Sequence, residues 1–153
     1  MRRKKTKTIA LIIYSSFIIS ILSMVAFASP AEGAWGYYNE YGYYYKNQSI
    51  IETSGSTNVM GNTRVGPETQ TIPTGYVKAQ CRIYYSSNGA LYDQTLMIES
   101  NGALTPGNYW RVTLQKTNAP SKTTFYTKGC TQAYTPSGYV QYSTFASPDQ
   151  STT

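Results

Sequence analysis

From Ala34 onward, apolar and polar residues alternate with a period of two, and no long stretch has helical three- and four-residue spacing. The clearest alternation runs over Tyr76–Tyr85. Its apolar side, which we expect to face a core, consists of Val77, Ala79, Cys81, Ile83 and Tyr85. This pattern predicts a half-buried β-strand.

The residues after this strand predict a hairpin. Asn88-Gly89 readily adopts the positive backbone angles of a tight turn. The next run, Ala90–Glu99, is expected to pair back with Leu96 and Ile98 inside. Further strands are predicted over Tyr109–Thr117, with Trp110, Val112 and Leu114 on the inner face, over Lys122–Ala133, and in a segment that ends at Phe145.

Two segments lack a strong strand pattern. Thr53–Ile72 is polar and predicts a long loop or weak edge strands, and residues 148–153 are expected to fray. Strands that recur about every ten to fifteen residues between tight turns predict an all-β fold. We expect one antiparallel β-sandwich or small barrel, with an ordered core over residues 34–147.

The N-terminal residues predict export. A cationic start precedes an apolar stretch from Ile9 to Ala28, and Ala26-Phe27-Ala28 has the small-x-small pattern of a signal-peptidase site. We expect a signal peptide over 1–28, cut between Ala28 and Ser29, with a second possible cut after Ala31. The alternative is an uncleaved membrane anchor, since about twenty apolar residues approach spanning length. The secreted domain is then 29–153, which meets a membrane only during export.

Most of the net charge belongs to this N-terminal segment. The formal charge of the chain is +6, but five of its 13 basic residues lie in the first seven positions. Eight basic and all seven acidic residues remain after it. The near-neutral domain therefore gives no support for nucleic-acid binding through overall basicity.

Cys81 and Cys130 are the only cysteines of the chain. In an exported protein the pairing of two cysteines is the default expectation, so the sequence predicts one disulfide. Closing a loop of about fifty residues would stabilise the fold by at most about 4 kcal/mol.

The chain contains no histidine. Its absence excludes Ser-His-Asp and Cys-His catalysis and most zinc sites. Paired carboxylates remain conceivable, but Asp93 and Glu99 on one strand would lie about 20 Å apart, too far to share a glycosidic bond. Glu40, Glu52 and Glu68 are scattered among polar or aromatic neighbours. We therefore expect a protein that is not an enzyme and has no metal or cofactor.

Tyrosines and cations alternate on two predicted outward faces. The residues concerned are Tyr76, Lys78, Arg82 and Tyr84 on one strand and Tyr109 and Arg111 on another. If both strands share a sheet, the surface could stack on sugar rings or attract anionic wall polymers. An ordinary solvated sheet face is the alternative. Single-stranded nucleic acid fits poorly because the cations are few.

The densest aromatic stretch runs from Trp35 to Asn47. In a single strand, one side would carry Trp35, Tyr37, Tyr41, Tyr43 and Tyr45, and the other would carry Tyr38 and Tyr44. Gly36 and Gly42 would let that strand bend. Three interpretations stay open: a core strand, a glycan- or surface-binding face, and a disordered segment.

Two sets of motifs resemble known secreted proteins. "TGYVKAQCRIYYSSNGALY" and "SKTTFYTKGCTQAYTPSGYVQYSTFASPDQ" resemble small secreted β-rich proteins of Bacillus-type Gram-positive bacteria, over residues 73–149. The resemblance implies a single exported β domain and carries over no catalytic residue. "EGAWGYYNEYG" is similar to the mature start of lactococcin-972-type bacteriocins, which are small secreted all-β proteins, although the histidines of that family are missing here.

These observations lead to one expected function and one alternative. We expect a secreted protein that binds a cell-wall polymer, glycan or other envelope component through tyrosine-rich sheet faces. The alternative is a secreted antibacterial protein that acts on the envelope of a competitor.

Overall fold

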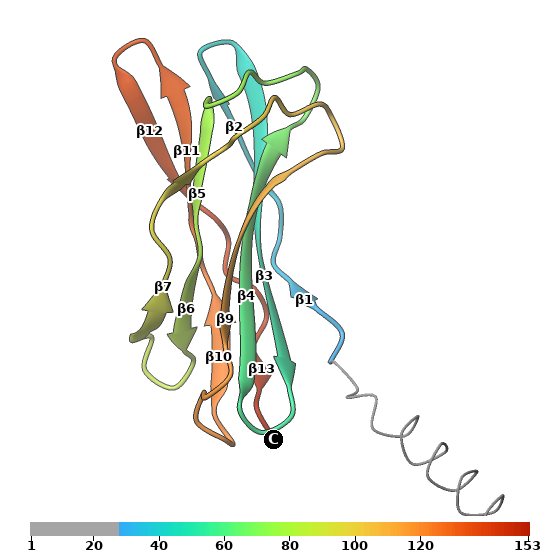
Figure 1. Cartoon of the computed structure of the whole chain (residues 1–153), viewed down its shortest axis with the longest axis vertical. Coiled ribbons are helices and arrows are strands. Elements are labelled where there is room, and N and C mark those ends of the chain that lie inside the picture. Colours follow the sequence, from blue (N-terminus) through green and yellow to red (C-terminus); the bar gives the residue numbers. More distant parts are fainter. Residues whose placement is uncertain (1–27) are drawn as a thin grey trace, which may run out of the picture.

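The computed structural model describes residues 28–153 (Figure 1). This part of the chain consists of antiparallel β-strands, turns and loops, without a helix. Accordingly, no helix within it could cross a membrane. The expectation of an all-β, antiparallel fold is confirmed.

Within residues 28–153, thirteen strands form three sheets. The first sheet contains β1 (Ala31–Glu32), β2 (Gly36–Glu40), β3 (Tyr43–Ser54), β4 (Asn58–Pro67) and β9 (Trp110–Lys116). Its order is β1-β3-β4-β9, and β2 also pairs with β3. The second sheet has the order β12 (Gly138–Ser143), β11 (Cys130–Thr135), β5 (Val77–Gln80) and β8 (Ile98–Glu99). The third has the order β13 (Gln150–Ser151), β10 (Thr124–Thr127), β6 (Arg82–Tyr85) and β7 (Leu91–Gln94).

The core lies between the first sheet and the other two, which follow one another along its length. One cluster joins Tyr45, Val65 and Val112 of the first sheet to Val77, Ala79 and Ala133 of the second. The other joins Ile51 and Val59 to Ile83 and Phe125 of the third sheet. This layering is consistent with a β-sandwich.

The alternation over Tyr76–Tyr85 predicts burial correctly. The side chains of Val77, Ala79, Cys81 and Ile83 are fully buried. The run is nevertheless divided, because β5 belongs to the second sheet and β6 to the third. The turn at Asn88-Gly89 then joins β6 to β7, with φ of Gly89 at 70°.

The interpretation of Thr53–Ile72 as a loop or edge segment is wrong. It contains β4, an interior strand between β3 and β9. Its inner positions are small because the sheets approach closely: a Cβ on Gly61 would lie 2.8 Å from Cγ1 of Ile83 and 2.9 Å from Sγ of Cys81. The small residues at these inner positions therefore do not produce the apolar–polar alternation that would predict a strand from the sequence.

The interpretation of Ala90–Glu99 as one strand is also wrong. The run is split between β7 of the third sheet and β8 of the second, and Leu96 is 83% exposed and Ile98 43% exposed. Tyr92 packs against the core instead. A single alternation cannot describe a segment that changes sheets.

The C-terminal residues do not fray. Gln150 and Ser151 pair with β10 as β13, and Thr152 is buried. Backbone and side-chain hydrogen bonds of Thr152 to Thr123 hold the end of the chain. The expectation of a frayed C-terminus is based on the polarity of these residues, which does not reveal such contacts.

The disulfide prediction is wrong. Cys81 and Cys130 are both buried and are not bonded to each other. Cys130 lies opposite Gln80, and partners in a ladder point to the same side of the sheet. Cys81, the next residue, points to the other side, toward Gly61 of β4. Burial raises the pKa of the Cys81 thiol to about 12.

The predicted signal peptide falls almost wholly on residues 1–27, which lie outside the described residues. Cleavage between Ala28 and Ser29, and secretion itself, stay predictions.

Candidate functional site

The tyrosine-rich stretch forms a hairpin rather than a single bent strand. Tyr41 and Gly42 both have positive φ, 49° and 77°, and form a two-residue turn between β2 and β3. Glu40 pairs with Tyr43 and Tyr38 with Tyr45. The turn reverses the chain, so residues of the same parity on its two sides face opposite ways.

One side of this hairpin packs inward. Tyr45 is 1% exposed and belongs to the core, and Tyr38 and Tyr43 pack against the same cluster. The stripe expected for a single strand is therefore divided: Tyr45 is core, whereas Tyr37 and Tyr41 are exposed. A binding role for Tyr43 and Tyr45 as outward residues does not fit this placement.

The other side of the hairpin is open to solvent. Tyr37 is 64% exposed and lies opposite Lys46, and Tyr44 is 52% exposed and lies opposite Asn39. The amide of Glu68 donates to the Tyr44 carbonyl and extends the sheet beside these residues. A groove of about 260 Å³ is lined by Tyr37, Tyr38, Asn39, Tyr44, Tyr45 and Glu68.

Two further rings lie next to this groove and hold two cations. The ring centroids of Trp35 and Tyr109 are 5.3 Å apart. Cζ of Arg64 lies 4.6 Å from the Trp35 centroid, and Nζ of Lys46 lies 5.3 Å from it. Both distances suit cation–π attraction. We refer to Trp35, Tyr37, Tyr44, Lys46, Arg64 and Tyr109 together as the outer aromatic face.

Glycine makes room for one of these rings. A Cβ on Gly66 would lie 2.8 Å from Cδ1 of Tyr109, so the ring rests on bare backbone of β4. Gly66 of β4 pairs directly with Lys46 of β3. A side chain at 66 would push Tyr109 away from the two cations.

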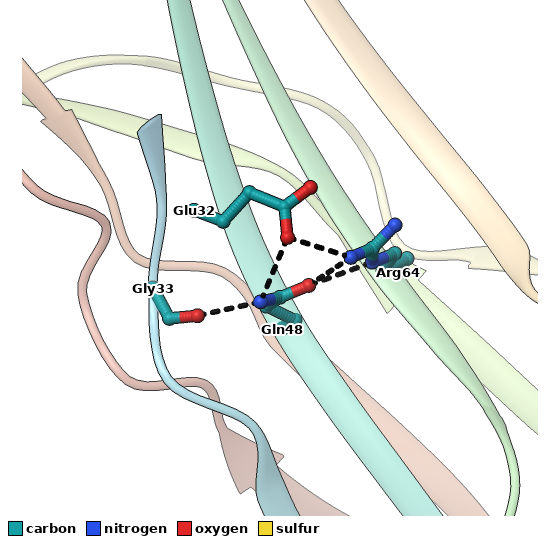
Figure 2. Close-up of polar contacts among 4 residues, drawn as sticks. All are labelled: Glu32, Gly33, Gln48 and Arg64. Atoms are coloured by element: carbon teal, nitrogen blue, oxygen red, sulfur yellow. Dashed lines mark hydrogen bonds and ion pairs between the residues drawn. The ribbon is translucent and has the colours of Figure 1, made fainter. Parts of the chain in front are cut away.

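A polar network fixes Arg64, and Figure 2 shows its four residues. Nε2 of the buried Gln48 donates to the Gly33 carbonyl at 2.6 Å and to Glu32 at 3.4 Å. Arg64 donates through Nε to Oε1 of Gln48 at 2.8 Å and through Nη2 to Glu32 at 3.1 Å. Because these bonds come from β1, β3 and β4 and from Gly33 just after β1, they hold the guanidinium in one position.

Lys46 is held in a similar way. Its Nζ lies 2.7 Å from Oε2 of Glu68, and this contact raises the pKa of the lysine amine. Both cations of the outer aromatic face are therefore already paired with carboxylates.

The two outward sets that the sequence predicts do not share a sheet. Arg111 lies opposite Arg64 in the first sheet, next to the outer aromatic face. Lys78 lies on β5 of the second sheet, and Tyr76 directly precedes that strand. Arg82 and Tyr84 lie on β6 of the third sheet. Lys78 pairs with Glu99 at 3.0 Å, and Tyr84 stacks on Tyr126 with centroids 5.2 Å apart. Tyr44, Lys46, Gln48 and Arg64 are not among the candidate binding residues that the sequence predicts, and Arg64 lies in the segment interpreted as a long loop or weak edge strands.

The carboxylates considered for hydrolysis are mostly engaged elsewhere. Glu68, Asp93 and Glu99 form ion pairs, and Glu40 accepts a hydrogen bond from Tyr142. Within residues 28–153, no group of three or more His, Cys, Asp or Glu residues could hold a metal ion.

No family model, curated protein or solved structure matches this chain. The outer aromatic face presents exposed phenols, an indole, and two cations paired with carboxylates.

Proposed function

We propose that this is a secreted, non-enzymatic protein that binds a cell-envelope or extracellular glycan through its outer aromatic face. The observation that carries the proposal is the exposure of Tyr37 and Tyr44, at 64% and 52%, beside one groove on a fully paired hairpin. Large side chains gathered on an exposed surface are characteristic of interaction sites.

The chemistry around the groove suits sugar rings. The face of a phenol or indole packs on the apolar face of a pyranose, and nearby polar groups can bond its hydroxyls. Asn39 and Glu68 line the groove, and Lys46 lies opposite Tyr37. The site therefore offers both stacking and directional bonding.

The paired cations favour a glycan over a polyphosphate chain. Nucleic-acid sites need unpaired cations along the backbone track. Here Lys46 is bound to Glu68 and Arg64 to Glu32, so most of the positive charge is already compensated. Neutral or weakly charged sugars fit this balance better.

Preorganisation also supports binding. Gln48 is buried and orients Arg64, and Trp35 lies against that guanidinium. Groups that are already ordered lose little entropy when a ligand binds.

Co-sedimentation of residues 29–153 with purified wall polysaccharide, peptidoglycan and soluble glycans tests the proposal. A Tyr37→Ala/Tyr44→Ala variant is expected to bind about tenfold more weakly, since the loss of two stacking rings should cost at least about 1.4 kcal/mol. Tyr84→Ala is the matched control, because Tyr84 is on another sheet and stacks on Tyr126.

Two outcomes would contradict the proposal: no retention by any fraction, or equal retention of the double variant. Growth inhibition of related strains in the absence of glycan binding would favour the antibacterial alternative instead.

A further inference from the structure

Eight of the sixteen tyrosines form a continuous series of ring contacts between the first and second sheets. Neighbouring centroids are 3.8 to 6.4 Å apart. We call this series the tyrosine ladder; its members, in order of contact, are Tyr142, Tyr38, Tyr45, Tyr43, Tyr76, Tyr134 and Tyr41, with Tyr139 as a branch on Tyr134. In Figure 1 the β2–β3 and β11–β12 hairpins, which supply most of these residues, lie at the same end of the molecule.

The ladder is most tightly stacked at Tyr142 and Tyr38, whose rings are inclined by only 13° at 3.8 Å between centroids. Tyr38 continues the stack onto Tyr45 at 5.2 Å and 12°. Close, nearly parallel aromatic rings are the arrangement in which an electron passes most readily from one ring to the next.

A carboxylate accepts a hydrogen bond from a phenol at two places on the ladder. Tyr142 donates its O–H to Glu40. On the branch, Tyr139 donates to Glu99 at 3.3 Å and to the Gly75 carbonyl at 2.7 Å. A phenol that loses an electron becomes a strong acid, so its oxidation is easiest where a bonded base can take the proton at once.

The other terminus of the ladder is exposed. Tyr41 is 56% exposed, and its ring makes a T-shaped contact with Tyr134, with centroids 5.9 Å apart. It has φ of 49° at a turn position where asparagine or glycine is usual, so a bulky side chain is kept there against backbone preference. A strained residue of this kind suggests a role at that position.

Tyr37 and Tyr44 provide an internal comparison. They belong to the same hairpin and are about as exposed as Tyr41, at 64% and 52% against 56%. Among the described residues, however, the ring contacts of the ladder do not include them.

We propose that the tyrosine ladder is an oxidative modification site, which one-electron oxidants such as a peroxidase with hydrogen peroxide convert into a Tyr41–Tyr41 cross-link between two copies of this chain. The oxidant removes one electron from Tyr142, and the phenolic proton moves to Glu40. One electron then passes from Tyr41 along the ladder to Tyr142, which takes its proton back from Glu40. Tyr41 loses its own proton to solvent and carries the radical.

The coupling step balances. Two Tyr41 radicals join through the ring carbons next to their hydroxyl groups, and the hydrogens on those carbons shift to the oxygens as the rings become aromatic again. In total, two phenols lose two electrons and two protons. One hydrogen peroxide takes them up and gives two molecules of water.

The test is oxidation of residues 29–153 with a peroxidase and hydrogen peroxide. Dityrosine fluorescence, covalent dimer on denaturing gels and peptide mass mapping are the readouts. The expected product is a Tyr41–Tyr41 cross-link that exceeds cross-links at Tyr37 and Tyr44 several-fold.

Variants separate the ladder from simple exposure. Tyr142→Phe and Glu40→Gln leave Tyr41 unchanged and are expected to lower the Tyr41 cross-link yield several-fold. Tyr41→Phe should abolish the dimer, whereas Tyr37→Phe/Tyr44→Phe should leave its yield unchanged. Tyr38→Phe keeps the ring but removes the oxidisable phenol at a second position of the series, in case either of the first two variants does not fold.

Cross-links distributed over Tyr37, Tyr41 and Tyr44 according to exposure would overturn the proposal. So would unchanged Tyr41 yields in folded Tyr142→Phe and Glu40→Gln proteins. Because Tyr41 is not part of the outer aromatic face, glycan binding can fail or succeed without affecting this result.

Discussion

The hydroxyl group of Tyr45 is a buried polar atom within the tyrosine-rich core. The residue is 1% exposed, and its hydroxyl has no hydrogen-bond partner among the described residues. A buried hydroxyl without a partner costs about 1–3 kcal/mol of desolvation. Tyr45→Phe keeps the ring and removes this group, so we expect the free energy of unfolding to rise by about 1 kcal/mol in urea denaturation at neutral pH.

Tyr38→Phe is the control for this prediction. The Tyr38 hydroxyl contacts Oγ1 of Thr131 at 3.0 Å, so its removal should lower the free energy of unfolding by about 1 kcal/mol. A Tyr45→Phe protein that is as destabilised as Tyr38→Phe would contradict the prediction.

For Cys81, the sequence predicts burial but not the pairing of its thiol. Alternation within one strand predicts its burial correctly, because burial depends only on which side of the strand a residue occupies. Pairing with Cys130 depends on the register between β5 and β11, and that register puts Gln80 opposite Cys130. No pattern within either strand contains that information.

Among the elements, the β6–β7 and β2–β3 hairpins differ in how clearly the sequence predicts their turns. Asn88-Gly89 is a dipeptide typical of turns and predicts the β6–β7 hairpin correctly, although the bond from the Tyr85 amide to the Ala90 carbonyl closes a loop longer than two residues. Tyr41-Gly42 adopts positive φ at a tyrosine, which sequence preference disfavours, so the stretch reads as one strand. Missing that turn assigns Tyr37, Tyr41 and Tyr45 to the same face.

The C-terminal strand β13 should stabilise the whole fold. Oε1 of Gln150 accepts hydrogen bonds from the amide and the hydroxyl of Thr53, and Oγ1 of Thr152 donates to the Pro120 carbonyl. Removal of residues 150–153 breaks these bonds and the pairing with β10. We expect the free energy of unfolding to fall by about 2 kcal/mol or more, as measured by urea denaturation.

Removal of Thr153 alone is the matched control for this truncation. It eliminates only the bond from its amide to the Gly55 carbonyl at 3.1 Å and should have a smaller effect. Equal stability of the full chain and the chain that ends at 149 would support a frayed end instead.

For the molecule as a whole, the sequence predicts the class of fold better than the arrangement of the strands into sheets. Period-two alternation and turn residues are local and lead to an antiparallel all-β fold. The partition into three sheets depends on long-range contacts, such as those that place β4 between β3 and β9. The outer aromatic face shows both cases: Trp35, Tyr37 and Tyr109 are predicted, whereas Lys46 and Arg64 join them only through the register of the first sheet.

Several tyrosine hydroxyls and one cysteine thiol have raised pKa values, so the stability of the whole molecule should depend on pH in the alkaline range. Burial, aided by the bond to Glu40, raises the pKa of Tyr142 to about 12, and burial raises that of Cys81 to about 12. Burial also raises the pKa values of Tyr38 and Tyr45 well above the usual value for a phenol. In the unfolded chain these groups titrate near 10 for tyrosine and near 9 for cysteine.

Stability should therefore decrease as the pH rises above about 9. Between the unfolded and folded pKa values the folded protein keeps protons that the unfolded chain has released, so each step upward in pH favours unfolding. The contribution is complete below about pH 9 and is lost progressively toward pH 12 and beyond. Free energies of unfolding from urea titrations at about pH 7, 9 and 10.5 measure this slope. Tyr45→Phe and Cys81→Ala should each make the slope shallower, because each removes one group whose folded pKa is raised. A flat profile up to about pH 10.5 would show that these groups titrate alike in both states.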